Sequence, residues 1–352
     1  MITRDELMAA VIASPDDDIP RLVLADWFAE RGDPRGELIH VGCVLAAGSL
    51  DDAQRAACER RYAELIAGPG TLWLTELKLK NEVVAFRRGM VEAVALQWER
   101  FPAVADRLFA STPLRALTTW DFGDNGLRQW GQMPWLGRLQ DLHLRGVDPH
   151  QLRSLLAPSD LTNVRRLTIE GNHRGQLGLA GARLIASWPS FPKVIELALI
   201  NAGLTDAAVA TLGERMGQLS AVDFTINDCG LDSLRVVASH GARLTRLALG
   251  SNRIGNAGAQ RLATAEGLSQ LESLRLESAQ LGDPGALAIL SSPLLPRLRR
   301  LDFASNQLTD AGAVAIAAVE GRELASLDVS ANRIGARGER ALRARYGDRV
   351  RI

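Results

Sequence analysis

Residues 298–308 read Leu298-Arg-Arg-Leu301-Asp-Phe303-Ala-Ser-Asn306-Gln-Leu308. Stretches that begin at Leu244 and Leu324 keep the same spacing, L-x-x-L-x-L-x-x-N-x-L, with other large apolar residues at some Leu positions. First positions of the pattern fall at residues 91, 114, 139, 164, 194, 219, 244, 271, 298 and 324, which are 23 to 30 residues apart. Such a period indicates stacked units, so the usual domain length of about 150 residues does not apply.

Each unit predicts a strand followed by a helix. The central L-x-L alternates with a period of two, so one face of the strand is buried and the other is exposed. The Asn that comes next can satisfy backbone groups at the turn. Stretches such as those beginning at Thr205 and Thr309 are rich in Ala and predict helices, with Thr as the N-cap.

Residues 91–352 therefore resemble the long, ribonuclease-inhibitor-like class of leucine-rich repeat. The resemblance implies an α/β solenoid of about ten repeats, a horseshoe with parallel strands inside and helices outside. The copy at residues 271–281 has Ala279 in place of Asn. Residues 171–176 lengthen the fourth repeat by about three residues, and residues 227–230 shift the sixth by one. A functional loop and neutral drift are both open interpretations of these changes.

Residues 1–67 do not share the repeat and predict a small all-helical domain. The expected helices run from a capping box at Thr3 and Glu6 to Ala13, from Pro20 to Arg31, and over residues 37–47 and 51–67. Residues 68–90 are apolar enough to form an N-terminal cap or linker to the solenoid. The solenoid, residues 91–352, ends in an Arg-rich C-terminal cap.

The stretch Ser14-Pro-Asp-Asp-Asp-Ile-Pro-Arg-Leu-Val-Leu-Ala-Asp-Trp-Phe-Ala-Glu-Arg-Gly-Asp-Pro-Arg-Gly-Glu resembles a small bacterial domain that accompanies repeat regions at their N-terminal side. Phe86-Arg-Arg-Gly-Met-Val-Glu, which leads into the first strand, is similar to the segment that comes after that domain in such proteins, although Met90 stands where a larger apolar residue is expected. The resemblance implies a bacterial protein and this architecture. It implies no biochemical activity.

Composition excludes several classes of partner. Lys and Arg number 41 and Asp and Glu number 41, so no excess of charge favours nucleic acid or an anionic membrane. Three separated cysteines and no CxxC spacing argue against a disulfide scaffold and a structural zinc site. The N-terminus shows no signal peptide and no run of 18 apolar residues occurs, so we expect a cytoplasmic protein without cofactors.

Candidate catalytic and metal-binding residues are few. Asp16, Asp17 and Asp18 could bind a metal ion, although carboxylates at a helix start are the preferred interpretation. Asp302 and Asp328 occupy equivalent strand positions about 5 Å apart and could form an acid–base pair in a hydrolase. Arg275 and Arg300 lie close enough to neutralise that pair, however, and the sequence places no nucleophile beside it. Isolated His143 and Cys229 complete this group, and we predict that the protein is not an enzyme.

A binding surface is the remaining prediction. The outward-facing positions expected to bind a protein on the concave face are Trp98, Trp120, His143, Arg145, Arg166, Glu170, Glu196, Asp223, Arg275, Glu277, Asp302 and Asp328. Trp98 and Trp120 are either the main contributors to binding or pack against the N-terminal cap. The predicted function is non-enzymatic protein–protein interaction. The alternative is a regulator of a partner enzyme, such as a GTPase-activating protein-like factor that uses Arg145.

The two ends of the chain differ in charge. Residues 1–37 carry nine acidic and four basic side chains, whereas residues 331–352 carry seven Arg and two acidic ones. The basic end either binds an acidic partner or is a solvated cap. The sequence does not identify the partner, and a monomer is the preferred oligomeric state.

Overall fold

The computed structural model describes residues 2–80, 82–158, 160–171, 176–321 and 323–352. The chain divides into two compact units, residues 1–143 and 144–352. The lengthened loop predicted in the fourth repeat falls mostly at residues 172–175, outside the described residues. No helix in the described part of the chain is both long and apolar enough to cross a membrane.

Unit 1 begins with helices. They are α1 (Arg4–Ala13), α2 (Asp18–Ala29), α3 (Arg35–Ala47), α4 (Asp52–Ala67) and α5 (Gly70–Glu76). The four predicted helices are confirmed, and the predicted capping box of Thr3 and Glu6 is present. Helix α2 starts two residues before Pro20 because the Asp17 side chain accepts a hydrogen bond from the Ile19 N–H.

Repeats then follow within unit 1. Their elements are β1 (Val83–Arg87), β2 (Met90–Gln97), α6 (Phe101–Ser111), β3 (Ala116–Trp120), α7 (Asp124–Trp130) and the first part of β4 (Asp141–Arg145). Strand β1 pairs antiparallel with β2, whereas β2 and β3 are parallel. Residues 68–90 thus contribute a helix and an edge strand, neither of which the repeat pattern contains.

A tight turn sets the β1–β2 pairing. Arg88 and Gly89 connect the strands with φ of 49° and 76°, the left-handed geometry of a two-residue hairpin turn. A Cβ at Gly89 would lie 2.4 Å from the Ile39 Cα atom, so the turn packs directly on the backbone of α3. The hairpin therefore joins the helical segment to the first repeats.

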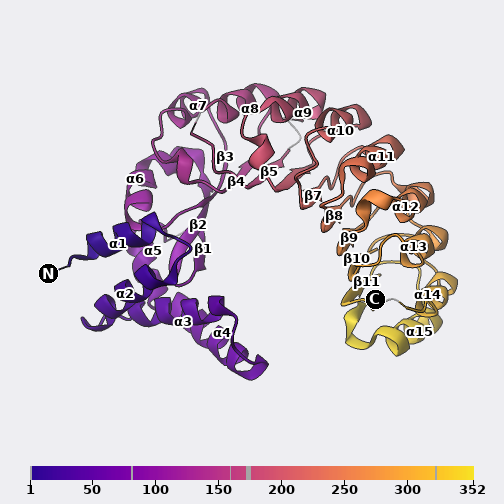
Figure 1. Cartoon of the computed structure of the whole chain (residues 1–352), viewed down its shortest axis with the longest axis horizontal. Coiled ribbons are helices and arrows are strands. Elements are labelled where there is room, and N and C mark those ends of the chain that lie inside the picture. The colour runs from indigo at the N-terminus through magenta and orange to yellow at the C-terminus, as the bar shows by residue number, and fades with distance from the viewer. Residues whose placement is uncertain (1, 81, 159, 172–175, 322) are drawn as a thin grey trace. The chain divides into compact units, whose positions relative to one another are not determined.

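Unit 2 alternates strands and helices throughout. The strands are β5 (Arg166–Glu170), β6 (Glu196–Ile200), β7 (Ala221–Asp223), β8 (Arg246–Ala248), β9 (Ser273–Arg275), β10 (Arg300–Asp302), β11 (Ser326–Asp328) and β12 (Val350–Arg351). The helices are α8 (Pro149–Leu156), α9 (Gly178–Ser187), α10 (Asp206–Gly213), α11 (Leu231–His240), α12 (Gly255–Ala263), α13 (Asp283–Leu290), α14 (Asp310–Ala317) and α15 (Ala336–Tyr346). Strands β5 to β12 pair in parallel and in chain order. In unit 2 the helices form a layer on one face of this sheet (Figure 1).

All ten predicted strands are present, as β2 to β11. Strand β12 is additional: Val350 and Arg351 pair with Leu327 and Asp328 of β11. The basic end of the chain therefore closes the sheet with a strand as well as with helix α15.

The predicted asparagine contacts are confirmed and form what we call the asparagine ladder, Asn227, Asn252, Asn306 and Asn332. The Oδ1 atom of Asn306 accepts hydrogen bonds from the Ala279 and Leu281 N–H groups of the preceding repeat, at 3.0 and 2.9 Å. Its amide donates to the Leu276 carbonyl at 2.8 Å. Each asparagine thus satisfies backbone groups that have left the strand pairing of the repeat before it.

A second set of contacts runs the other way along the chain. Asp206, Asn256, Asp283 and Asp310, which we call the helix-start residues, accept hydrogen bonds from the N-terminus of the next repeat's helix. Asp310, for example, accepts from the Gly335 and Gly338 N–H groups at 2.9 and 2.7 Å. A Cβ at Gly338 would lie 2.7 Å from the Asp310 Oδ1 atom, so the contact favours glycine there.

The helix-start residues partly replace ordinary N-caps. Thr309 caps α14 by accepting from the Ala311 and Gly312 N–H groups, as predicted. Thr205 also occupies the N-cap position of α10, as predicted, but its side chain makes no cap hydrogen bond. Hydrogen bonds from Ser233 and its neighbours reach Asp206, and although burial alone raises its pKa, these bonds lower the pKa overall.

Candidate protein-binding surface

The strand face of unit 2, meaning the outward-facing side chains of β5 to β12, is arranged in two rows by the strand register. The first row contains Arg166, Glu196, Ala221, Arg246, Ser273, Arg300 and Ser326, and the second Thr168, Ala198, Asp223, Ala248, Arg275, Asp302, Asp328 and Arg351. Neighbouring strands are about 4.8 Å apart, so residues next to each other in a row are in reach of one another. Distant parts of the sequence thereby form one surface.

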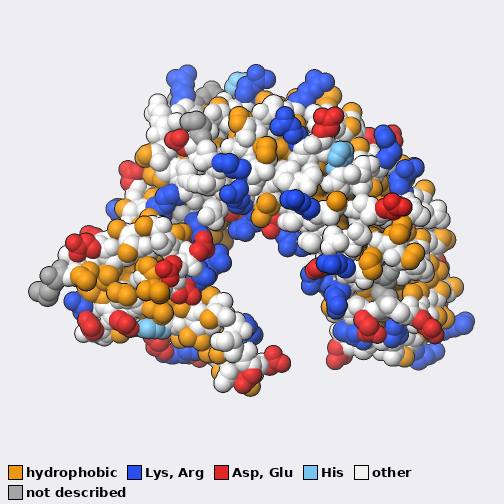
Figure 2. Space-filling view, viewed as in Figure 1, with side chains coloured by type: hydrophobic (Ala, Val, Ile, Leu, Met, Phe, Trp, Pro, Cys, Tyr) orange, Lys and Arg blue, Asp and Glu red, His pale blue; other side chains and the backbone are white. Residues whose placement is uncertain are grey.

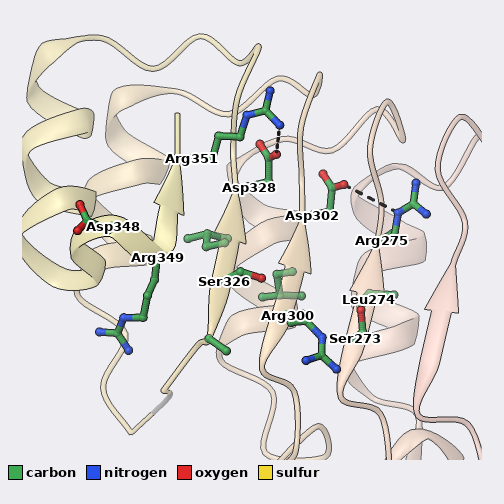
Figure 3. Close-up of a pocket in the computed structure, with 13 residues that line it drawn as sticks. Ser273, Leu274, Arg275, Arg300, Asp302, Ser326, Asp328, Asp348, Arg349 and Arg351 are labelled. Carbon is green, nitrogen blue, oxygen red and sulfur yellow. Dashed lines mark ion pairs between the residues drawn. The ribbon is translucent and has the colours of Figure 1, made fainter. Parts of the chain in front are cut away.

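Ion pairs hold most charges of the second row. Arg275 lies 3.9 Å from Asp223 on one side and 4.0 Å from Asp302 on the other, and its Nη2 donates to Glu277 at 2.8 Å. Arg351 lies 3.5 Å from Asp328. Figure 3 shows the Arg275–Asp302 and Arg351–Asp328 pairs at one end of the strands. All five charged members of the second row therefore have an ion-pair partner within the row, three Asp sharing two Arg.

The first row has one ion pair that crosses two strands. Arg246 lies 2.8 Å from Glu196, and the residue between them in the register is Ala221. The small side chain of Ala221 leaves room for the long Arg246 side chain to pass over it. Arg300, further along the row, makes no ion pair or hydrogen bond through its side chain to any residue that the structure describes.

Several predicted surface residues lie where the sequence indicated. Arg145 donates to Glu170 at 3.0 Å, and both are in unit 2. In unit 1, Trp120 ends β3 and His143 lies in β4, and both side chains are partly exposed. Arg166 is exposed at the start of β5.

The prediction that Trp98 projects from the strand surface is wrong. Trp98 is only 2% exposed and begins a short 3-10 helix, Trp98–Arg100, directly after β2. Its ring stacks on Phe122 with centroids 5.0 Å apart and contacts Phe101 and Trp130, each at 5.6 Å. Trp98 therefore belongs to the core between the repeats of unit 1.

Asp302 and Asp328 hold turns rather than a reacting group. The Oδ1 atom of Asp302 accepts from the Ala304 N–H at 3.0 Å, and that of Asp328 accepts from the Ser330 N–H and hydroxyl at 2.9 and 2.6 Å. Arg275 faces Asp302 as predicted, but the second neutralising residue is Arg351, not Arg300. The geometry gives both carboxylates a structural role.

The acidic triplet of residues 16–18 is distributed among three contacts. Asp17 caps α2, Asp18 lies 2.9 Å from Arg88, and Asp16 accepts from Arg115 at 2.8 Å, which lowers the Asp16 pKa. These contacts agree with the helix-start interpretation. Within the described residues, no group of three or more His, Cys, Asp or Glu side chains could hold a metal ion.

Arg115 extends this contact into a buried network in unit 1. It donates to Glu92 at 2.7 Å, and the other oxygen of Glu92 accepts from Arg21 at 2.6 Å. Arg21 is fully buried, and this burial lowers its pKa. The network connects α2 with strand β2. Removal of one partner would leave the other charge buried and unpaired, which would destabilise the folded state.

Cys229 is buried, and this burial raises the pKa of its thiol to about 12. A thiol in this state is a poor nucleophile at neutral pH. Cys229 has a structural role through its backbone: its N–H donates a hydrogen bond to Asn252 of the asparagine ladder at 2.9 Å.

The repeat geometry agrees with a known protein family. A family model for leucine-rich repeats matches residues 244–263, 268–290 and 296–317. The chain therefore contains leucine-rich repeats. The leucine-rich-repeat fold suggests a module for protein–protein interaction.

Solved structures similar to this leucine-rich-repeat protein include a Bacteroides fragilis protein, with a TM-score of 0.48 and 16% identity over 82% of this chain and 88% of that one. They also include an internalin from Listeria monocytogenes, with a TM-score of 0.40 and 15% identity over 80% of this chain and 93% of the other. A search of curated proteins found no match.

Proposed function

We propose that this leucine-rich-repeat protein is a non-enzymatic module that binds a protein partner on the strand face of unit 2. The observation that carries the proposal is the set of ion pairs that connects Glu196 with Arg246, and Arg275 with Asp223, Glu277 and Asp302. Arg246 and Arg275 are about half exposed, with 51% and 49% of their side-chain surface accessible. Figure 2 shows how charged side chains of both signs gather on the surface of the molecule. Exposed pairs of this kind contribute only about 0–1 kcal/mol to folding stability.

The consequence of these ion pairs is orientation of the charged groups. A long side chain that is already held in one rotamer loses less entropy on binding, which saves about 0.5–1.5 kcal/mol for each immobilised side chain. The pairs also fix the pattern of positive and negative charge that a partner meets, and such patterns govern specificity more than affinity. Both effects favour recognition of a partner by the strand face.

The alternative predicted from the sequence, a GTPase-activating protein-like regulator, would use Arg145 in the partner's active site. The Arg145 guanidinium donates to Glu170 within its own chain, so this contact would first have to break. This geometry gives no support to the regulator, and we retain the binding module as the proposal.

Site-specific photo-crosslinking tests the proposal. A photoreactive phenylalanine analogue replaces Ala198 on the strand face of β6, and the matched control places it at Ala210, an exposed residue of α10. Both variants are expressed in the native cells, irradiated, and compared after their fold is checked by circular dichroism. We expect a discrete covalent adduct with one protein from Ala198 and none from Ala210. Adducts from Ala210 alone, or the same adducts from both positions, would contradict the proposal.

A further inference from the structure

A groove of about 550 Å³ lies on the strand face at the C-terminal end of unit 2. It is formed by β9, β10, β11 and the chain at 348–351, and Figure 3 shows its lining. The two rows of the strand face both pass through it. In the figure, the second-row pairs stand at one end of the strands, while Ser273, Arg300 and Arg349 lie toward the other.

The first row supplies hydrogen-bond donors to this groove. Arg300 pairs in register with Ser273 on one side and Ser326 on the other. Among the residues that the structure describes, none accepts a hydrogen bond from the Ser273 or Ser326 hydroxyl or from the Arg300 guanidinium. Arg300 and Ser326 are exposed and Ser273 is partly exposed, so all three donors are accessible from solvent.

The acidic residues of the groove do not complement these donors. Asp302 and Asp328 belong to the second row and are occupied by Arg275, by Arg351 and by backbone N–H groups. Asp348 also lines the groove, but in Figure 3 it lies on the far side of Arg349 from Arg300. The groove contains one more Arg than Asp, and Arg300 is the Arg without an ion pair among the described residues.

The chemistry of these donors specifies an anion. A guanidinium only donates hydrogen bonds, and its planar fork matches a carboxylate in a bidentate geometry. A hydroxyl on each neighbouring strand, about 4.8 Å away, can donate to the same carboxylate or to the adjoining peptide. Arg349 also lines the groove but lies 3.3 Å from Glu323, so the positive charge that the groove leaves without an ion pair among the described residues is that of Arg300.

We infer that this groove binds an acidic segment of the partner protein, with a Glu or Asp carboxylate on Arg300 between Ser273 and Ser326. This inference rests on the proposed function, because it assigns the chemistry of the partner at one part of the strand face. Charge complementarity supports it: the carboxylates of the second row are already ion-paired with Arg275 and Arg351, whereas Arg300 of the first row is an exposed positive group without an ion pair among the described residues.

Fluorescence polarisation with a labelled decapeptide of alternating Glu and Ser tests the inference on the full chain at low ionic strength. We expect binding of this peptide and none of the matched Gln–Ser peptide. Arg300→Gln should weaken binding by roughly tenfold or more, the range for a hydrogen bond to a charged group. The control Arg340→Gln removes the same charge from the exposed face of α15 and should leave affinity unchanged.

Three results would overturn the inference. The first is that the acidic peptide does not bind. The second is that Arg340→Gln loses as much affinity for the peptide as Arg300→Gln, which would indicate general charge attraction. The third is that a phosphoserine peptide binds more tightly and depends on Arg300, which would assign a phosphorylated segment instead. If the acidic peptide does not bind but the photoreactive analogue at position 198 still gives its covalent adduct, the proposed function stands. Loss of the adduct would contradict the proposed function itself.

Discussion

Removing Asn306, a member of the asparagine ladder, should destabilise the C-terminal repeats strongly. In Asn306→Ala, the N–H groups of Ala279 and Leu281 lose their acceptor, and the Leu276 carbonyl loses its donor. The Phe303 carbonyl keeps a second donor, the Asn332 amide. Three backbone groups are therefore left without partners in a region where Asn306 itself is 8% exposed.

The magnitude comes from these three groups. A buried polar group without a partner costs about 1–3 kcal/mol. Water that enters the space left by the side chain satisfies part of this need, so we expect about 3–5 kcal/mol of destabilisation. This is a large share of the roughly 5–15 kcal/mol by which proteins of this kind are stable.

Urea unfolding and native-state hydrogen exchange measure the effect. Exchange should rise over β9 to β11, because neighbouring repeats share these contacts while distant ones do not. The matched control is Gln307→Ala, which truncates the adjacent, exposed amide side chain and should change stability little. A destabilisation below about 1 kcal/mol in Asn306→Ala, or uniform exchange along the whole chain, would refute the reasoning.

Three further predictions concern other contacts. Trp98→Ala should cost about 3–5 kcal/mol in thermal unfolding, whereas Trp27→Ala, at a partly exposed position, should cost less; equal losses would contradict the core position of Trp98. Cys229 should react with iodoacetamide at pH 8 far more slowly than the partly exposed Cys58, since burial raises the Cys229 thiol pKa to about 12. Mass spectrometry of the labelled sites measures the two rates, and equal labelling of both cysteines would contradict the prediction. The Asp206 pKa is lowered in the folded state, so its stabilisation is complete above the unfolded-state pKa of about 4 and is lost as the pH falls through the lower folded-state pKa. Asp206→Asn should therefore flatten this acid limb in pH-dependent urea unfolding, and an unchanged limb would contradict the assignment.

The strands could be predicted because the repeat pattern encodes burial directly. Leu247 and Leu249 are buried and Arg246 is exposed, as a period of two requires. Strand β1 was not predicted, because its pairing depends on a hairpin turn and not on the repeat. Arg88 is not a residue typical of that turn, so the sequence did not indicate it. Trp98 is two residues after buried Leu96, so the alternation itself places it inward.

The candidate site was predictable in composition but not in pairing. The sequence places charged residues on the strand face, and the structure assigns their partners. Arg246 reaches Glu196 past Ala221, a choice that depends on side-chain length and on the small residue between them. Likewise, Arg351 faces Asp328 only because the last residues form β12, which no repeat pattern marks. The sequence could not show that Arg300 is left without an ion pair among the described residues, because Arg300 was expected to neutralise the aspartates.

The two sets of contacts between repeats bear on how such a chain gains and loses length in evolution. Asn306 serves the repeat before it, and Asp310 serves the repeat after it, so each junction exchanges acceptors in both directions. Duplication or deletion of one whole repeat joins junctions of the same kind and leaves the donors matched. A change of a few residues separates an asparagine from the turn it completes. Whole repeats are thus the natural steps by which this surface grows or shrinks while the rest of the fold is kept.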